Sequence, residues 1–162
     1  DWKFVVDGSE KIISTSGEYP SVNGDFISVE TKLIEKGYEA PIHDFSIELN
    51  DEDFSNELLS EEKLLMFVLY NLSKSNFELS SEIIKKSNQA VKSGYKVIGI
   101  TASGIDKQLE VKGQYGFEFD FYTCDETALK TIIRSNPGAL EIKSGTIVNK
   151  WHYNDFNKIK FD

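Results

Sequence analysis

Cys124 is the only cysteine in the chain and the strongest nucleophile among its side chains. A single cysteine excludes an intramolecular disulfide, so any thiol chemistry would use one sulfur and an external thiol. The sequence Thr123-Cys124-Asp125-Glu126 fits a capping box, in which the helix dipole would favour the thiolate while the two carboxylates oppose it. Two interpretations stay open: a reactive thiol, and an ordinary small residue at a helix start.

The other side chains offer no recognisable metal, phosphate or cofactor site. Two histidines, His43 and His152, together with one cysteine lack the spacing typical of zinc ligands. The sequence also has no phosphate-binding loop, nucleophile elbow or dinucleotide fingerprint. We therefore expect neither a metal nor a cofactor.

The composition is that of an acidic globular chain. With 162 residues, of which 40% are hydrophobic, it can bury one sizeable core, and we expect one compact unit. The net charge of -9 and the pI near 4.8 disfavour nucleic acid as a partner, because phosphate binding needs clustered Lys and Arg. The longest apolar run, Leu64–Tyr70, is strand-sized, so we predict no membrane span within these residues.

The first third of the chain is predicted to be rich in short strands. Turn signals at Asp7-Gly8 and Asn23-Gly24 separate β-rich runs. The predicted strands cover Trp2–Val6, Lys11–Ser14, Asp25–Val29 and Asp44–Leu49.

From Leu64 onward, buried strands alternate with helices, a pattern typical of βαβ units. Leu64–Tyr70 and Val97–Thr101 are predicted strands covered on both faces, with a helix over Asn76–Lys92 between them. A second helix is predicted over Ile105–Gln114. Its expected N-cap is Ser103.

The last third is predicted to add a strand, a helix and a hairpin. Phe117, Phe119 and Phe121 alternate with polar residues, which indicates a half-buried strand. After Asn136-Pro137, the runs Ala139–Lys143 and Thr146–Trp151 predict the hairpin.

This order of elements is similar to the thioredoxin fold, and several short motifs strengthen the likeness. Gly37-x-x-Ala40-Pro41 followed by Asp44-Phe45-Ser46 resembles the leading strand of peroxiredoxins and TlpA-like thiol–disulfide proteins, with two extra residues after the proline. Leu64–Leu72 resembles their core strand, and Asn136-Pro137-Gly138 occupies the place of their cis-proline.

A narrower resemblance is to the C-terminal portion of Bacteroidetes DoxX-type membrane proteins. It rests on four motifs: Glu35-Lys36-Gly37-Tyr38, Pro41-Ile42-His43-Asp44-Phe45-Ser46, Arg134-Ser135-Asn136-Pro137-Gly138 and Asn149-Lys150-Trp151-His152-Tyr153. It implies a chain that begins in mid-protein, a membrane segment elsewhere in the parent protein, and a location on the periplasmic side of the inner membrane.

Together the resemblances imply an α/β thioredoxin-like fold, with a central mixed β-sheet flanked by helices. We assign residues 37–162 to this domain and residues 1–36 to a β-rich N-terminal extension.

In the redox-active members of the family, a C-x-x-C motif lies between the core strand and the next helix. The matching stretch here places Ser73 and Asn76 at the two cysteine positions. A serine hydroxyl forms no disulfide and is far too weakly acidic to replace a thiolate, so dithiol–disulfide exchange is not expected. Ser75-Asn76-Phe77-Glu78 fits a capping box, so helix capping is the ordinary role of these side chains.

The resemblance also implies that the Asn136–Pro137 bond is cis and borders a groove that holds an extended substrate backbone in active relatives. The ordinary role of Pro137 is a turn that fixes the hairpin. We therefore predict a redox-inactive binding or scaffold module that presents this groove to a peptide or protein. The alternatives are a monothiol oxidoreductase that uses Cys124, and a structural domain that folds against its membrane segment or oligomerises.

Overall fold

A computed structural model describes residues 1–32 and 45–161, and its contacts divide the chain into two compact units, Asp1–Pro41 and Ile42–Asp162. The prediction of one compact unit is corrected here, because the first strands build a sheet of their own instead of extending the main one. The predicted boundary after residue 36, the Gly37-x-x-Ala40-Pro41 motif and His43 lie outside the described residues.

The first unit is a three-stranded antiparallel sheet with the order β2-β1-β3. Its strands are β1 (Trp2–Val6), β2 (Ser9–Ile13) and β3 (Asp25–Val29). Asp7 and Gly8 both have positive φ angles, 52° and 76°, as a tight hairpin turn requires. Phe4 is fully buried, with its ring centroid 5.9 Å from that of Tyr19 and 5.8 Å from that of Phe26.

The second unit is built on a seven-stranded mixed sheet with the order β10-β9-β6-β7-β8-β4-β5. Its strands are β4 (Glu48–Leu49), β5 (Glu52–Asp53), β6 (Leu64–Val68), β7 (Lys96–Thr101), β8 (Phe121–Thr123), β9 (Gly138–Lys143) and β10 (Thr146–His152). The three strands β6, β7 and β8 are parallel, while β9 and β4 run antiparallel to their neighbours.

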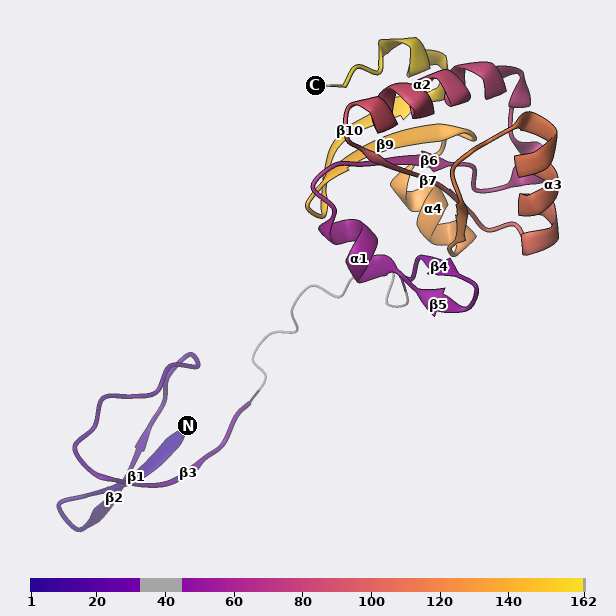
Figure 1. The fold of residues 1–162 in the computed structure, drawn as a ribbon. Helices are drawn as coiled ribbons and strands as arrows, with labels where there is room; N and C mark the ends of the chain where they lie inside the picture. The colour runs from indigo at the N-terminus through magenta and orange to yellow at the C-terminus, as the bar shows by residue number, and fades with distance from the viewer. Residues whose placement is uncertain (33–44, 162) are drawn as a thin grey trace. The chain divides into compact units, whose positions relative to one another are not determined.

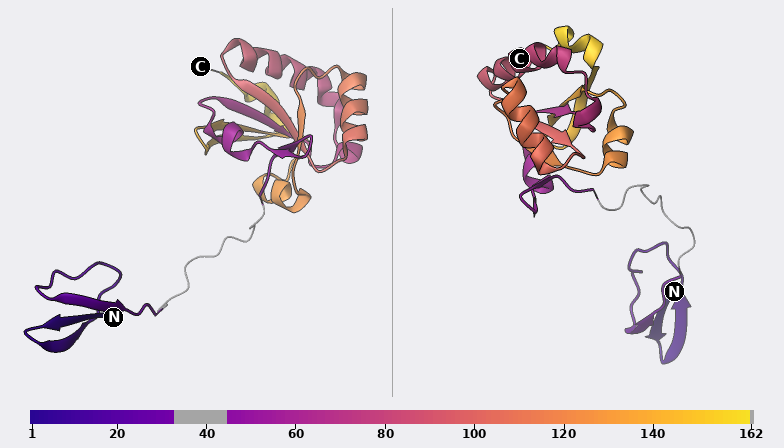
Figure 2. Two further views of the ribbon diagram at one scale, coloured as in Figure 1. Left: turned by 60° about the horizontal axis from the view of Figure 1, so that its bottom comes forward. Right: turned by 90° about the vertical axis from the view of Figure 1, so that its right-hand side faces the viewer.

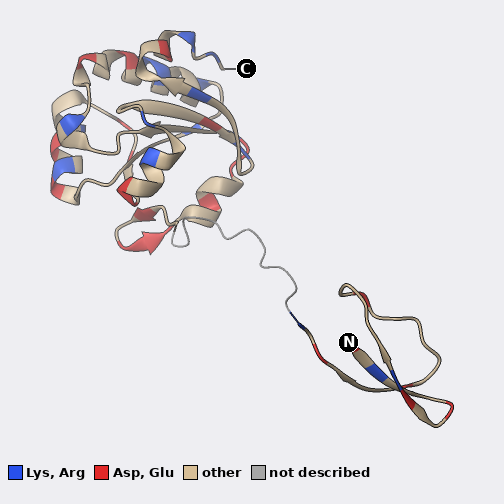
Figure 3. Cartoon of the chain, turned by 180° about the vertical axis from the view of Figure 1, so that it is seen from behind, with Lys and Arg blue, Asp and Glu red and all other residues tan. Residues whose placement is uncertain are grey.

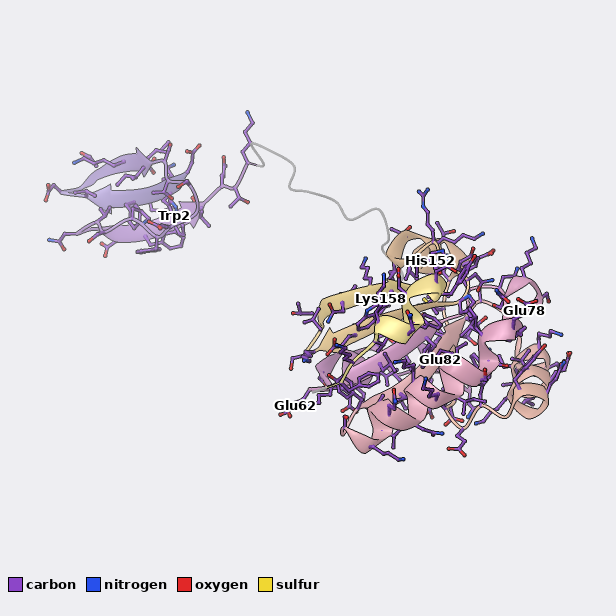
Figure 4. The ribbon with its side chains drawn as sticks, turned by 90° about the horizontal axis from the view of Figure 1, so that it is seen from above. Trp2, Glu62, Glu78, Glu82, His152 and Lys158 are labelled. Atoms are coloured by element: carbon purple, nitrogen blue, oxygen red, sulfur yellow. The ribbon has the colours of Figure 1, made fainter. Side chains whose placement is uncertain are left out.

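Helices cover both faces of this sheet, as predicted (Figures 1 and 2). The α-helices are α1 (Ser55–Ser60), α2 (Ser80–Lys92), α3 (Ile105–Tyr115) and α4 (Glu126–Ile132), and the 3₁₀ helices are η1 (Leu72–Lys74), η2 (Phe77–Leu79) and η3 (Tyr153–Lys158). Residues of α2, α3 and η3 pack into the core on one face, and residues of α1 and α4 into the core on the other. Figure 4 looks onto the first face, with Glu82 on α2 and Lys158 on η3 labelled.

Strand β6 explains why one apolar run could be recognised in the sequence. Leu65 and Phe67 pack into the core on one face of the sheet, whereas Leu64 and Met66 pack into the core on the other. A strand that is buried on both faces needs apolar residues at successive positions, not at alternate ones. The predicted helix over Asn76–Lys92 is shorter in the structure, since η2 precedes α2.

Two local predictions before β8 were wrong. Ser103 does not cap α3: Gly104 is the N-cap, and the Ser103 hydroxyl accepts a hydrogen bond from the Leu72 amide at 3.0 Å. The predicted strand through Phe117 and Phe119 begins only at Phe121, although all three rings are buried.

Acidic residues gather on the β4–β5 hairpin, where Figure 3 shows them in red, and α1 carries one more, Glu57. Within residues 1–32 and 45–161, no helix combines the length and the apolar character needed to cross a lipid bilayer.

Candidate functional site

The structure places Cys124 in the core just after β8, with 4% of its surface exposed. The predicted capping box was wrong, because the N-cap of α4 is Asp125, whose carboxylate accepts a hydrogen bond from the Ala128 amide at 2.9 Å. The amide of Cys124 donates to the Thr101 carbonyl at 2.9 Å, which keeps this segment extended for one residue beyond the strand. The sulfur therefore lies before the helix.

Burial raises the pKa of the Cys124 thiol to about 11. A hydrogen bond from the Asp125 amide favours the thiolate, while the negative charges of Asp125 and Glu48 disfavour it further. The net result is a protonated thiol at neutral pH. This is the opposite of the low-pKa, accessible thiol that nucleophilic chemistry requires.

Thiol labelling should show this directly. We expect maleimide or iodoacetamide to modify Cys124 of the folded chain at least about a hundredfold more slowly at pH 8 than a free thiol, because the thiolate is scarce and the sulfur is buried. The rate should keep rising with pH toward the pKa of about 11. The same chain in urea is the control and should react at the ordinary rate. A rate that levels off near pH 7 would contradict the assignment.

The two residues predicted to stand at the C-x-x-C positions, Ser73 and Asn76, differ in their surroundings. Ser73 lies in η1 and is exposed. Asn76 is the N-cap of η2, and its side-chain oxygen accepts a hydrogen bond from the Glu78 amide at 3.1 Å. Leu72, the neighbour of Ser73, packs in the core on the face opposite to that of Cys124. Cys124 is thus buried in one core, whereas Ser73 is exposed next to a residue of the other core.

Ser75 has a role that sequence reasoning missed. Instead of capping a helix, its hydroxyl lies 3.0 Å from the Asn71 carbonyl and 2.9 Å from the Asn136 side-chain oxygen. The Asn136 side-chain amide donates to the same Asn71 carbonyl at 2.9 Å, and the Asn76 amide donates to the Asn136 carbonyl at 3.3 Å. Nothing in the sequence marked this contact, because its partners are 61 residues apart.

Three of these bonds, all of them made by Asn136, join the segment that follows β6 to the loop that precedes β9. The Asn136–Pro137 peptide bond in that loop is cis, as predicted. Pro137 itself is buried, and its carbonyl accepts a hydrogen bond from the Ser135 hydroxyl. The next residue is Gly138, and a larger residue would not fit there, because its Cβ atom would lie 2.6 Å from the Cδ1 atom of Ile133. The backbone around Pro137 is thus closely packed on its inner side.

The structure also contains a hollow of about 580 Å³. Its lining residues are Tyr70, Thr127, Lys130, Thr131 and Arg134. Tyr70 directly precedes the Asn71–Asn76 segment, and Arg134 stands two residues before Asn136. Sequence reasoning did not single out this hollow, although one signal was present: Arg134 is the only arginine in the chain.

No protein-family model matches the chain, and a search of curated proteins found no match. Solved structures do match. A thiol-disulfide oxidoreductase from Bacteroides fragilis is similar, with 15% identity, a TM-score of 0.53, and coverage of 66% of this chain and 84% of that one. The thioredoxin domain of a thiol-disulfide oxidoreductase from Bacteroides vulgatus has 12% identity, a TM-score of 0.52, and coverage of 70% and 88%.

A thiol:disulfide interchange protein from a Bacteroides species is also similar, with 12% identity, a TM-score of 0.52, and coverage of 70% of this chain and 81% of that one. At such low identity these likenesses establish the fold alone. The chain has a thioredoxin-like fold: a central mixed sheet flanked by helices, with a cis-proline loop before β9.

Proposed function

We propose that the chain is a redox-inactive thioredoxin-like module that binds a peptide or protein partner at the surface formed by the Asn71–Asn76 segment and the Asn136–Pro137 loop. One observation carries the proposal. The positions that match the paired cysteines of redox-active relatives hold Ser73 and Asn76, and the segment that contains them is hydrogen-bonded to the cis-proline loop through Ser75 and the Asn71 carbonyl.

Oxygen and nitrogen atoms at these positions support recognition and not electron transfer. Dithiol exchange requires a thiolate and a resolving sulfur, and neither Ser73 nor Asn76 supplies one. The hydrogen bonds between the two segments instead hold the surface in one conformation, which lowers the entropic cost of binding a partner. Ser73 and Lys74 remain exposed at its rim.

The second candidate function is that of a monothiol oxidoreductase which uses Cys124. The similarity of the fold to thiol-disulfide oxidoreductases favours it. The burial of the sulfur and the raised pKa of its thiol weigh against it. A mixed disulfide would form only if the region around β8 opened to admit a second thiol.

We further propose that this module is the C-terminal part of a DoxX-type membrane protein and lies on the periplasmic side of the inner membrane. The resemblance of the Arg134–Gly138 and Asn149–Tyr153 motifs supports the first part. The thiol–disulfide relatives of TlpA type support the second.

Reduction of insulin disulfides by dithiothreitol tests the choice between binding and redox chemistry. We expect the chain to leave the rate of insulin precipitation at the level of the buffer, because no pair of thiols is present to relay electrons. A parallel assay with glutathione and a mixed-disulfide substrate tests single-thiol chemistry, and Cys124→Ser is the matched control. Turnover that disappears in Cys124→Ser would establish the monothiol function and contradict the proposed one.

A further inference from the structure

We infer that the hollow lined by Tyr70, Thr127, Lys130, Thr131 and Arg134 binds an acidic peptide segment of the partner. The inference rests on the proposed function. The ligand is an extended peptide whose carboxylate side chains enter the hollow.

The charge of the hollow is opposite to that of the chain. The whole chain carries a net charge of -9, yet Lys130 and Arg134 both line this one hollow. A third cation, Lys150, lies close by, since its ammonium donates to the carbonyl of Ile132 at 2.9 Å. An acidic ligand is repelled by most of the surface and attracted here, which directs it to one place.

The guanidinium of Arg134 is available for a ligand. Within residues 1–32 and 45–161, the structure gives Arg134 no ion pair and no side-chain hydrogen bond, and the side chain is exposed. Its fork of donors matches a carboxylate bidentately. Lys130 already has two partners: its ammonium lies 2.8 Å from a Glu126 carboxylate oxygen and 5.3 Å from the centre of the Tyr70 ring. An incoming carboxylate would compete with Glu126 for it.

The form of the hollow favours a peptide over a small anion. Exposed ion pairs are weak, so a single phosphate held by these side chains alone would bind weakly. A volume of about 580 Å³ accommodates several side chains, and the Tyr70 ring offers an apolar surface for their aliphatic parts. The Thr131 hydroxyl already donates to the Thr127 carbonyl at 2.8 Å, so the threonines mainly contribute methyl groups and acceptors.

Two lining residues of the hollow also neighbour, in the sequence, the segments that form the surface of the proposed function. Tyr70 leads directly into Asn71, and Arg134 leads through Ser135 into Asn136. Both segments are held by the hydrogen bonds between Asn71, Ser75 and Asn136. A peptide that lies along this end of the sheet would place its acidic residues over α4.

Fluorescence anisotropy of a short labelled peptide in which Glu alternates with Thr tests the inference, with the full chain as receptor. We expect the peptide to bind, and the double variant Lys130→Gln/Arg134→Gln to weaken binding about tenfold or more, because two ion pairs are lost. The matched control is Lys92→Gln/Lys160→Gln, which changes the net charge equally at exposed positions away from the hollow and should bind like the unaltered chain. Binding should also weaken as salt is added.

Three outcomes would overturn the inference: no binding of the Glu peptide, equal weakening in both double variants, and displacement of the peptide by inorganic phosphate at a similar concentration. A peptide with Gln in place of Glu should fail to bind. Turnover in the insulin or glutathione assays would contradict the proposed function itself, whereas a chain without turnover that also ignores the Glu peptide would overturn this inference alone.

Discussion

Replacing Phe67 with alanine is expected to lower the free energy of unfolding of the second unit by about 3–5 kcal/mol. Phe67 is fully buried in the middle of β6, with its ring centroid 5.6 Å from that of Phe119 and 5.8 Å from that of Phe156. The substitution removes the apolar contacts of a whole ring and leaves a cavity that the surrounding close-packed side chains cannot fill by small shifts.

Urea denaturation followed by circular dichroism measures this loss. Phe161→Ala is the matched control, because it also removes a phenylalanine ring, but from a partly buried site. The centroid of the Phe161 ring lies 5.1 Å from that of Tyr95. We expect the control to lose about 1 kcal/mol. Equal losses in the two variants would show that the core around β6 is not packed as described.

The fold of the second unit could be predicted because its signals are local. The apolar run beginning at Leu64 identified β6, and Gly116 ended α3 in the left-handed conformation with a φ angle of 71°. The division into two units could not be predicted in this way. The runs that form β1, β2 and β3 would look the same whether they pair with one another or with the main sheet.

The candidate site was predicted only in outline, because its side chains take partners from distant parts of the chain. The N-cap of α4 was predicted at Thr123 but is Asp125 in the structure. The reason is that the Cys124 amide is hydrogen-bonded to the Thr101 carbonyl, a contact that follows from the pairing of β7 with β8. Likewise, Ser75 bonds to Asn136 and not to the helix that follows it. Short motifs therefore predict which segments belong to the site, whereas the hydrogen-bond partners of their side chains depend on tertiary contacts that the motifs do not contain.

Replacing Glu141 with glutamine is the second large effect that we expect. Glu141 lies in β9 with only 4% of its surface exposed, and its carboxylate accepts hydrogen bonds from the Tyr95 hydroxyl at 2.7 Å and the Asn149 amide at 2.6 Å. The Lys143 ammonium lies 3.1 Å away. Loss of the charge weakens all three contacts, so we expect the free energy of unfolding at pH 7 to fall by about 2 kcal/mol.

The pH dependence distinguishes this charged network from simple packing. Burial alone would raise the pKa of Glu141, but the bonds from Tyr95, Asn149 and Lys143 outweigh it and lower the pKa below its ordinary value of 4.5. The network therefore stabilises the folded chain above about pH 4.5 and loses this contribution as the pH falls through the lowered pKa. Urea titrations from pH 7 to pH 3 should show a shallower fall for Glu141→Gln, whereas Glu62→Gln, at an exposed site, should follow the unaltered chain. Identical acid profiles for the unaltered chain and Glu141→Gln would mean that the carboxylate does not contribute its charge to stability.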